Sequence, residues 1–185
     1  MSLRKRLYFN HLVYCLNLLL APSMFGRDLT EQVRADSKIE ERQVPIIVEK
    51  CIEAVEARGK LSLVAAYKVH AYPSEALEYE GIYRKTGGSS QSKFITQMFE
   101  RGDYASFDLC DADKFNDICS ITSVLKTYFR SLPVPLLTFD LHDQFMAAVA
   151  IRDSSFKNKS MTDLVNRLPD EHYFTLRMLM LHLNQ

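Results

Sequence analysis

Gly81-Ile82-Tyr83-Arg84-Lys85-Thr86-Gly87-Gly88 is the segment from which the rest of the chain is best understood. A cationic pair stands between glycines, which predicts a turn, and Ile82 and Tyr83 can anchor that turn on one side. An arginine held there points away from its own core, and its planar guanidinium suits the phosphate oxygens of another molecule. The alternative is an ordinary turn with a solvated arginine, and the octapeptide alone favours that alternative.

A second segment favours the functional interpretation of the arginine over the ordinary turn. It runs from Leu125 to Leu137 as Leu-Lys-Thr-Tyr-Phe-Arg-Ser-Leu-Pro-Val-Pro-Leu-Leu. Lys126 and Arg130 are four residues apart, so they share one face of the predicted helix, away from its apolar stripe. The alternative is that the two cations simply form a solvent-exposed face of the helix, as such pairs usually do. The Pro-x-Pro sequence that follows ends the helix and predicts an extended turn.

Together the two segments resemble the Rho GTPase-activating (RhoGAP) domain family. Its marks are a Gly-Ile-Tyr/Phe-Arg-x-Ser/Thr-Gly loop and, further on, a Leu-Lys-x-x-x-Arg-x-Leu-Pro-x-Pro-Leu helix end. Either motif alone is weak, but both in this order and at this spacing are a strong signal. The resemblance extends over Met24–Gly59 and Leu77–Gln185, including a first core helix that ends at Arg58-Gly59 and a late core helix after Leu168-Pro169.

The resemblance implies an all-α fold, a RhoGAP-like helical bundle. The family continues beyond the late core helix with a further loop and helix, so the bundle is expected to be incomplete at its C-terminus, with apolar faces of the last helix exposed. We expect residues 24–185 to form a partial RhoGAP domain with an insertion at residues 60–76. That insertion is either a loop insertion or translated intron sequence, and we favour the second.

By resemblance, the chain activates GTP hydrolysis by a Rho-family small GTPase in its GTP-bound form. Arg84 is then the arginine finger supplied in trans, and residues 81–88 are called the finger loop below. Lys126 is expected to contact the GTPase and Arg130 to brace the finger loop. The remaining residues of the binding face are Lys85, Pro133 and Pro135. The alternative is a truncated, weak or inactive RhoGAP-like module that binds without stimulating hydrolysis.

Neither the composition nor the motifs of the chain indicate a catalytic, metal or cofactor site. Lysine plus arginine and aspartate plus glutamate number 23 each, so the formal net charge is zero and the chain as a whole does not look like a nucleic-acid binder. The four cysteines form no Cys-x-x-Cys pair and have no histidine at metal-ligand spacing. No Ser/His/Asp set or dinucleotide loop is evident, and the five histidines are interpreted as surface or core residues. We therefore expect no cofactor, no metal and no intrinsic catalytic site.

Residues 1–23 differ from the rest. A basic start, an apolar run from Leu12 to Ala21 and small residues resemble a secretory signal, although Asn17 interrupts the run, which is short for a bilayer span. We favour an apolar helix packed on the domain or a mis-assigned start, and a cytoplasmic chain recruited to membrane sites by its GTPase.

Apolar periodicity predicts where the other helices lie. Helices are expected at Val44–Arg58, from Ser89 or Ser90 to Glu100, from about Lys114 to Arg130, after Thr138 and after Asp170. Thr30–Gln43 is predicted to be a connector and Asp153–Ser160 a polar loop, with a capping box at Ser160–Asp163. Predicted buried residues include Leu136, Leu137, Phe139, Val149 and Phe94, and the last helix is expected to be central.

Overall fold

The computed structural model describes residues 23–38, 41–69, 81–102 and 107–184, with only the backbone for residues 59–69. These ranges contain helices and no strand, which confirms the predicted all-α fold. No helix in the described part is long and apolar enough to cross a bilayer. The helices are α2 (Leu29–Asp36), α3 (Ile46–Val69), α4 (Ser89–Arg101), α5 (Ile118–Ser131), α6 (Phe139–Val149), α7 (Ser154–Val165) and α8 (Asp170–Leu183).

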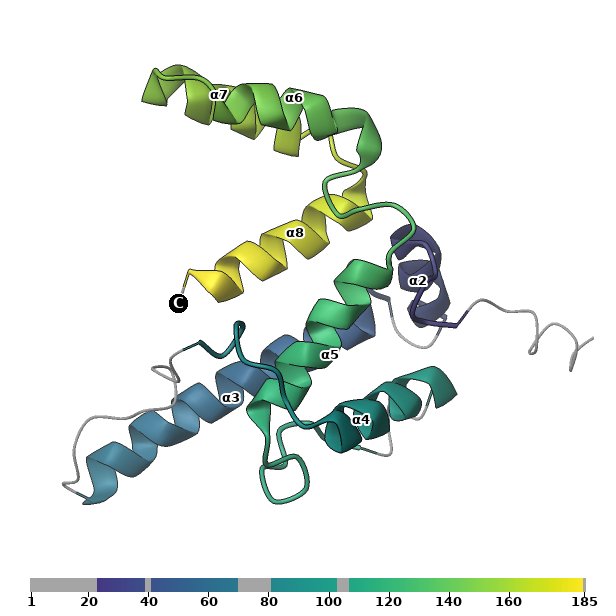
Figure 1. Ribbon diagram of the computed structural model, residues 1–185, viewed down its shortest axis with the longest axis vertical. Helices are drawn as coiled ribbons and strands as arrows, with labels where there is room; N and C mark the ends of the chain where they lie inside the picture. The colour runs from purple at the N-terminus through teal and green to yellow at the C-terminus, as the bar shows by residue number, and fades with distance from the viewer. Residues whose placement is uncertain (1–22, 39–40, 70–80, 103–106, 185) are drawn as a thin grey trace, which may run out of the picture.

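The main body forms around α5, which packs against both α3 and α4 (Figure 1). The buried stripe of α5 is the predicted one, with Ile121, Val124, Leu125 and Tyr128 almost fully inaccessible to solvent. Helix α8 returns to this body and lies against α2 and α3. The body thereby brings α3, α5 and α8, distant in sequence, around the finger loop.

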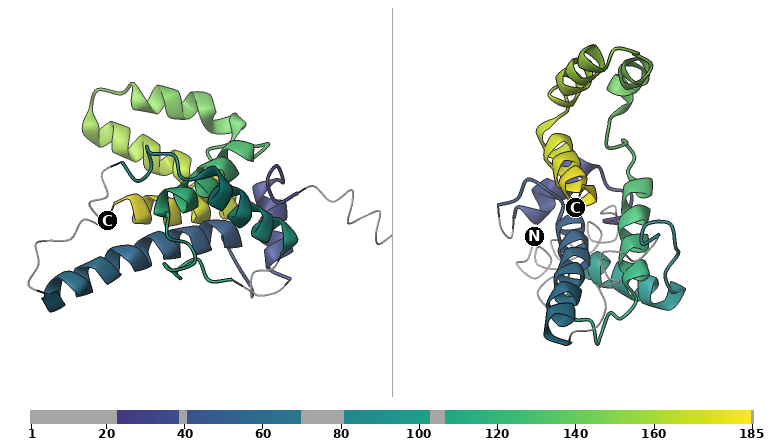
Figure 2. Two further views of the ribbon diagram at one scale, coloured as in Figure 1. Left: turned by 60° about the horizontal axis from the view of Figure 1, so that its bottom comes forward. Right: turned by 90° about the vertical axis from the view of Figure 1, so that its left-hand side faces the viewer.

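Helices α6 and α7 form a hairpin that stands off one end of the main body (Figure 2). It has a small apolar cluster of its own, centred on Leu141, Phe145 and Leu164. The prediction that Leu137, Phe139 and Val149 are buried is wrong, because they are 39%, 66% and 53% exposed. They lie outside both apolar clusters, since the hairpin packs on itself rather than flat on the body.

Helix α3 does not end at Arg58-Gly59 as predicted, but continues to Val69. A single glycine costs a helix only about 1 kcal/mol relative to alanine, and the following Lys, Leu and Ala residues favour helix. Arg58 therefore does not mark the helix end, and its guanidinium donates to the backbone carbonyls of Leu109 and Phe115. Residues 60–69 of the predicted insertion are helical, residues 70–76 lie outside the described residues, and the insertion itself stays a prediction.

Helix α2 was missed and the start of α7 was predicted too late, because the buried sides of these helices are not simple apolar stripes. The predicted connector contains α2, which is capped by the Asp28 carboxylate and buries Gln32 and Asp36 beside its apolar residues. The Asp36 carboxylate accepts the Ile46 N–H at 2.9 Å, which links α2 to the start of α3. Burial raises the pKa of Asp36, against the effect of its hydrogen bonds with the Ile46 N–H and the Gln32 side chain.

The predicted polar loop at Asp153–Ser160 belongs to α7 instead. This helix starts after Asp153, whose carboxylate accepts the Phe156 N–H at 2.7 Å, and the predicted capping box lies inside the helix. Only Leu164 of α7 is buried, so apolar periodicity gives no sign of the helix. Gly88, Thr138 and Pro169 are the N-cap residues of α4, α6 and α8, and none of the three makes a side-chain capping hydrogen bond.

Helix α8 is central in position but not buried all round. Its buried side carries the polar residues His172, Thr175 and His182. Met180, Leu181 and Leu183 are about half exposed, at 49%, 55% and 52%. The expected exposure of apolar faces on the last helix is therefore confirmed, and Phe94 on α4, predicted to be buried, is also 45% exposed.

Candidate functional site

Arg84 lies on a tight turn in which one carbonyl oxygen accepts two backbone hydrogen bonds. The N–H groups of Arg84 and Lys85 both donate to the Gly81 carbonyl at 2.8 Å. Gly81 has φ +79°, a backbone conformation that favours glycine. The exposed Arg84 side chain folds over Gly81, so that a Cβ added to this glycine would lie 3.3 Å from the Nε atom of Arg84. Within the described residues its guanidinium has no hydrogen-bond or ion-pair partner, so it is available to another molecule.

The second half of the finger loop is fastened to the first turns of α5. Asp117, the N-cap of α5, accepts the Gly88 N–H at 2.7 Å, and Ser123 Oγ accepts the Gly87 N–H at 3.1 Å. Gly87 approaches the helix so closely that a Cβ there would lie 2.0 Å from the backbone nitrogen of Ser120. Any other residue at position 87 would therefore push the loop away from α5.

The carboxylate of Asp117 is the polar centre of this attachment. Burial by itself raises the pKa of Asp117, but hydrogen bonds from the Ser120 hydroxyl and from the Gly88 and Cys119 N–H groups outweigh it, so the pKa lies below its usual range. Charge-assisted hydrogen bonds of this kind are stronger than neutral ones. Asp117 therefore joins the loop to the helix most firmly in its ionised form.

Lys126 makes the contact that was expected of Arg130. Its Nζ donates to the carbonyl oxygens of Tyr83 at 2.8 Å and Lys85 at 3.3 Å, on either side of Arg84. Thr122 adds a hydrogen bond of 2.8 Å to the Ile82 carbonyl. Arg130, one turn further along α5, has an exposed side chain without a hydrogen-bond partner in the described part of the chain. Lys126 thus braces the finger loop, whereas Arg130 faces outward.

The opposite side of the finger loop is held by α8. The Tyr83 hydroxyl lies 2.6 Å from His182 Nε2, and His182 Nδ1 lies 3.0 Å from a carboxylate oxygen of Glu56 on α3. Burial, with the nearby Cys51 and Glu56, raises the pKa of Tyr83 to about 12. Three separate segments are joined by this chain of side chains immediately before Arg84.

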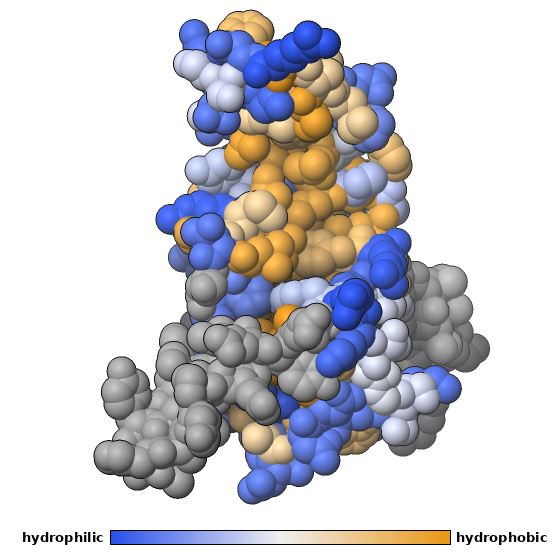
Figure 3. Space-filling view, turned by 60° about the vertical axis from the view of Figure 1, so that its left-hand side comes forward, coloured by the Kyte–Doolittle hydropathy of each residue, from blue (hydrophilic) through white to orange (hydrophobic). Residues whose placement is uncertain are grey.

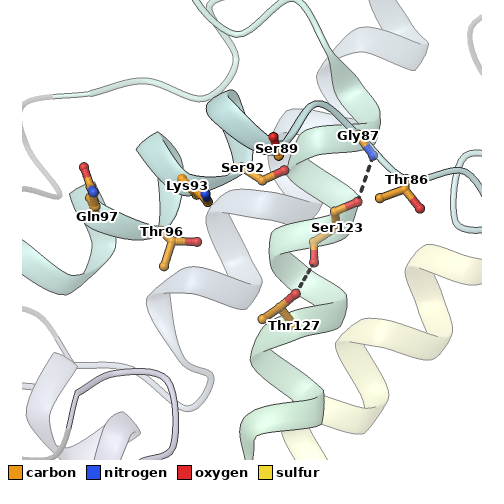
Figure 4. Close-up of a pocket in the computed structure, with 9 residues that line it drawn as sticks. All are labelled: Thr86, Gly87, Ser89, Ser92, Lys93, Thr96, Gln97, Ser123 and Thr127. Atoms are coloured by element: carbon orange, nitrogen blue, oxygen red, sulfur yellow. Dashed lines mark hydrogen bonds between the residues drawn. The ribbon is translucent and has the colours of Figure 1, made fainter.

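Two surface hollows flank α5 beside the finger loop. One, of about 390 Å³, is an apolar groove between α5 and α8, lined by Tyr83, Leu125, Lys126, Phe129, Arg130, Leu179 and Leu183. Figure 3 shows the apolar surface that extends over α8, between the α6–α7 hairpin and the finger loop. The other, of about 490 Å³, lies between α4 and α5 and is lined by Ser, Thr, Gln and Lys side chains (Figure 4).

The chain matches the family model of the RhoGAP domain over residues 45–185. It belongs to the RhoGAP domain family. Among its relatives, beta-chimaerin of Mus musculus is 33% identical over 159 residues, covering 85% of this chain and 41% of the relative. N-chimaerin of Homo sapiens is 31% identical over 163 residues, covering 88% of this chain and 30% of the relative. The RhoGAP chain thus spans less than half of the length of these relatives.

Solved structures agree with this membership. Human Rho GTPase activating protein 15 superimposes with a TM-score of 0.70 at 28% sequence identity, over 87% of this RhoGAP chain and 65% of that chain. The BH domain of GRAF, the GTPase regulator associated with focal adhesion kinase, gives a TM-score of 0.57 at 29% identity, over 74% and 63%. Both comparisons support the helical fold described above.

The RhoGAP structure places the predicted site residues around the end of α5. Arg84 and Lys85 are exposed on the finger loop, Lys126 lies beneath them, and Arg130 follows one turn away. Pro133 and Pro135 are exposed in the segment after α5. The structure thus brings the finger loop against Lys126 and leaves the prolines on the outer surface beyond α5.

Sequence reasoning missed the side chains that hold the finger loop in place. Asp117 carried a usable signal, because an Asp before an apolar periodic run is typical of a helix N-cap, whereas Ser123 lies inside α5 and carried none. Tyr83 was interpreted only as an apolar anchor, and His182 as an ordinary core or surface histidine. Their contact joins residues 99 positions apart, which no local pattern reveals.

Proposed function

We propose that this RhoGAP domain is a GTPase-activating protein for a Rho-family small GTPase and that Arg84 is its arginine finger. The observation that carries the proposal is an exposed arginine on a turn whose flanking carbonyl oxygens are held by Lys126. A guanidinium that is fixed at its base and exposed at its tip can enter the nucleotide site of a bound GTPase. Little reorganisation of the finger loop is then needed on binding.

The mechanism follows from charge. Phosphoryl transfer develops negative charge on the phosphate oxygens, and an arginine supplied in trans neutralises it. Such a finger accelerates hydrolysis by roughly a thousand- to hundred-thousand-fold, which corresponds to about 4–7 kcal/mol of the barrier. The chemistry stays in the GTPase, in its GTP-bound form, and this chain supplies the cation and its support.

The surrounding cations complete a binding face. Lys85 and Arg130 lie beside the finger at the surface, and Pro133 and Pro135 add a rigid exposed segment. These groups suit an acidic or phosphate-bearing partner surface. We propose that they contact the GTPase, and that Lys126 acts mainly from below, by holding the finger loop. The chain would act in the cytoplasm, at membrane sites where its partner is anchored.

Single-turnover GTP hydrolysis by a panel of purified Rho-family GTPases tests the proposal. The unmodified chain should accelerate at least one member strongly, and R84A should abolish that acceleration while leaving the fold intact by circular dichroism. R84K is the matched control for charge, because lysine keeps the cation but lacks the planar guanidinium. Absence of stimulation with every GTPase would refute the activator function.

A second candidate function is binding without activation. The open apolar groove beside Tyr83 favours it, since the finger loop is covered on that side by fewer contacts than on the α5 side. Under this function the chain binds a GTP-loaded Rho-family GTPase, and the hydrolysis rate of the complex equals the intrinsic rate. Measuring affinity and hydrolysis on the same samples separates the two functions.

A further inference from the structure

Tyr83 is held at both ends by residues of two different helices. Its carbonyl oxygen accepts from Lys126 of α5, and its hydroxyl meets His182 in the last turn of α8. The Tyr83 and His182 rings also pack edge to face, with centroids 5.9 Å apart. Tyr83 is therefore held on both sides, which restricts the direction in which the backbone leads into Arg84.

The hydrogen-bond directions in this cluster follow from its chemistry. The carboxylate oxygen of Glu56 is a hydrogen-bond acceptor, so the Nδ1–H of His182 is the donor in this contact. The other ring nitrogen of His182, Nε2, faces the Tyr83 hydroxyl at 2.6 Å. Because the pKa of Tyr83 is raised to about 12, the tyrosine keeps this proton at neutral pH. Each of the three side chains is thus hydrogen-bonded to the next.

The cluster is largely buried, as suits a structural contact. The side chains of His182 and Glu56 are only 7% and 22% exposed. Tyr83 itself borders the apolar groove between α5 and α8, and its hydroxyl meets His182 there. Loss of the Tyr83–His182 bond would remove this polar contact between the finger loop and α8.

We propose that Glu56, His182 and Tyr83 form a hydrogen-bonded relay that positions the finger loop, with Tyr83 and His182 as positioning residues for Arg84. The inference rests on the proposed function for its link to hydrolysis, but the relay itself is a property of the free chain. Through this relay, α8 helps to determine the conformation of the turn that carries Arg84.

Amide hydrogen exchange of the complete chain tests the relay without any GTPase. The N–H groups of Arg84 and Lys85, which both donate to Gly81, report the integrity of the turn. Removal of the hydroxyl in Y83F should accelerate their exchange by roughly fivefold, the factor that corresponds to one hydrogen bond. Y173F is the matched control. Tyr173 lies on α8 but packs against the apolar cluster of the hairpin, so the loss of its hydroxyl should change these rates by less than about twofold. Equal rates in Y83F and Y173F would overturn the relay.

A double-mutant cycle keeps the test independent of overall stability. Combining Y83F with H182A should accelerate exchange no more than the stronger single substitution, because both remove the same bond. Strictly multiplicative effects of the two substitutions would show that the residues act separately and would contradict the relay.

Stimulated hydrolysis then tests the positioning role. Y83F should lower the maximal stimulated rate by roughly fivefold and leave the half-saturating concentration unchanged. A loss of folded chain alone would raise the half-saturating concentration and leave the maximal rate unchanged. Faster exchange with an unchanged maximal rate would overturn the positioning role.

The two proposals can fail separately. If the unmodified chain stimulates no GTPase while Y83F still accelerates exchange, the proposed function is wrong and the relay stands. If the unmodified chain stimulates hydrolysis while Y83F leaves both exchange and maximal rate unchanged, the relay is wrong and the proposed function stands.

Discussion

The two sides of the finger loop are built differently. On the α5 side, Lys126, Thr122, Ser123 and Asp117 bind the backbone of the loop at successive positions, and Gly87 lies in direct backbone contact with the helix. On the α8 side, the side-chain bond from Tyr83 to His182 borders an open apolar groove. The comparison indicates that α5 determines where the loop lies, while α8 restricts the direction of the turn.

The close approach of Gly87 gives the largest expected effect on the α5 side. In G87A the new Cβ would overlap the backbone of Ser120, which cannot move without disturbing the start of α5. Displacement of the finger by about 1 Å should lower stimulated hydrolysis by about 100-fold. In G88A the Cβ would meet Asp117 at an ordinary 3.5 Å, so this matched variant should keep activity within about threefold. Similar losses in both variants would contradict the close-approach explanation.

Lys126 should give the next largest effect. K126M keeps the aliphatic stem but removes the two hydrogen bonds to the carbonyls that flank Arg84. Hydrogen bonds from charged donors contribute about 1.5–3 kcal/mol, so the maximal stimulated rate should fall by about 10- to 100-fold. Single-turnover rates at saturating chain concentration measure the change. A fall in affinity with an unchanged maximal rate would show that Lys126 is instead a partner contact.

Arg130 sharpens this assignment, because it is exposed and lies one turn from Lys126. R130M should raise the half-saturating concentration by about fivefold, as for a charge at the rim of an interface, and should leave the maximal rate unchanged. Titration of GTPase hydrolysis with chain concentration gives both parameters. A reduced maximal rate would show that Arg130 braces the finger loop, as the resemblance implied.

Asp117 gives the smallest effect, and one that depends on pH. D117A removes the N-cap of α5 and the bond to Gly88, which should lower the free energy of unfolding by about 1 kcal/mol at pH 7. The pKa of Asp117 is lowered on folding, so its contribution is complete above the unfolded value of about 3.9 and is lost as pH falls through the folded value.

Urea denaturation at pH 7 and pH 3 checks the Asp117 prediction. The difference between the unmodified chain and D117A should shrink at the lower pH. D113A, an exposed aspartate in the same loop, is the control and should show no such convergence. A difference that is the same at both pH values would contradict an ionised cap.

Those parts of the structure that depend on local pattern could be predicted from the sequence. The α5 stripe and the turn around Arg84 are examples, because periodicity and glycine placement encode both. Helix α2 could not be found this way, since Gln32 and Asp36 on its buried side look like surface residues until the start of α3 is in place. The start of α7 was predicted too late for a related reason, because only one residue of this helix is buried.

Sequence reasoning proposed Arg84, Lys126 and Arg130 as site residues, and their roles toward a GTPase stay predictions, but it did not reveal the contacts that hold the finger loop. Spacing placed Lys126 and Arg130 on one face, yet only the packing of the finger loop shows that Lys126 meets the carbonyls. The relay from Glu56 through His182 to Tyr83 joins residues 126 and 99 positions apart, which requires the assembled α3, α5 and α8.

The central proposal, that a pre-positioned Arg84 acts on the transition state, is tested most directly by comparing affinities for two states of a Rho-family GTPase. One state carries a non-hydrolysable GTP analogue, and the other carries GDP with aluminium fluoride, which mimics the transferring phosphoryl group. The unmodified chain should bind the aluminium fluoride state at least about 100-fold more tightly, and R84A should bind both states equally. Equal affinity of the unmodified chain for the two states would contradict the proposal.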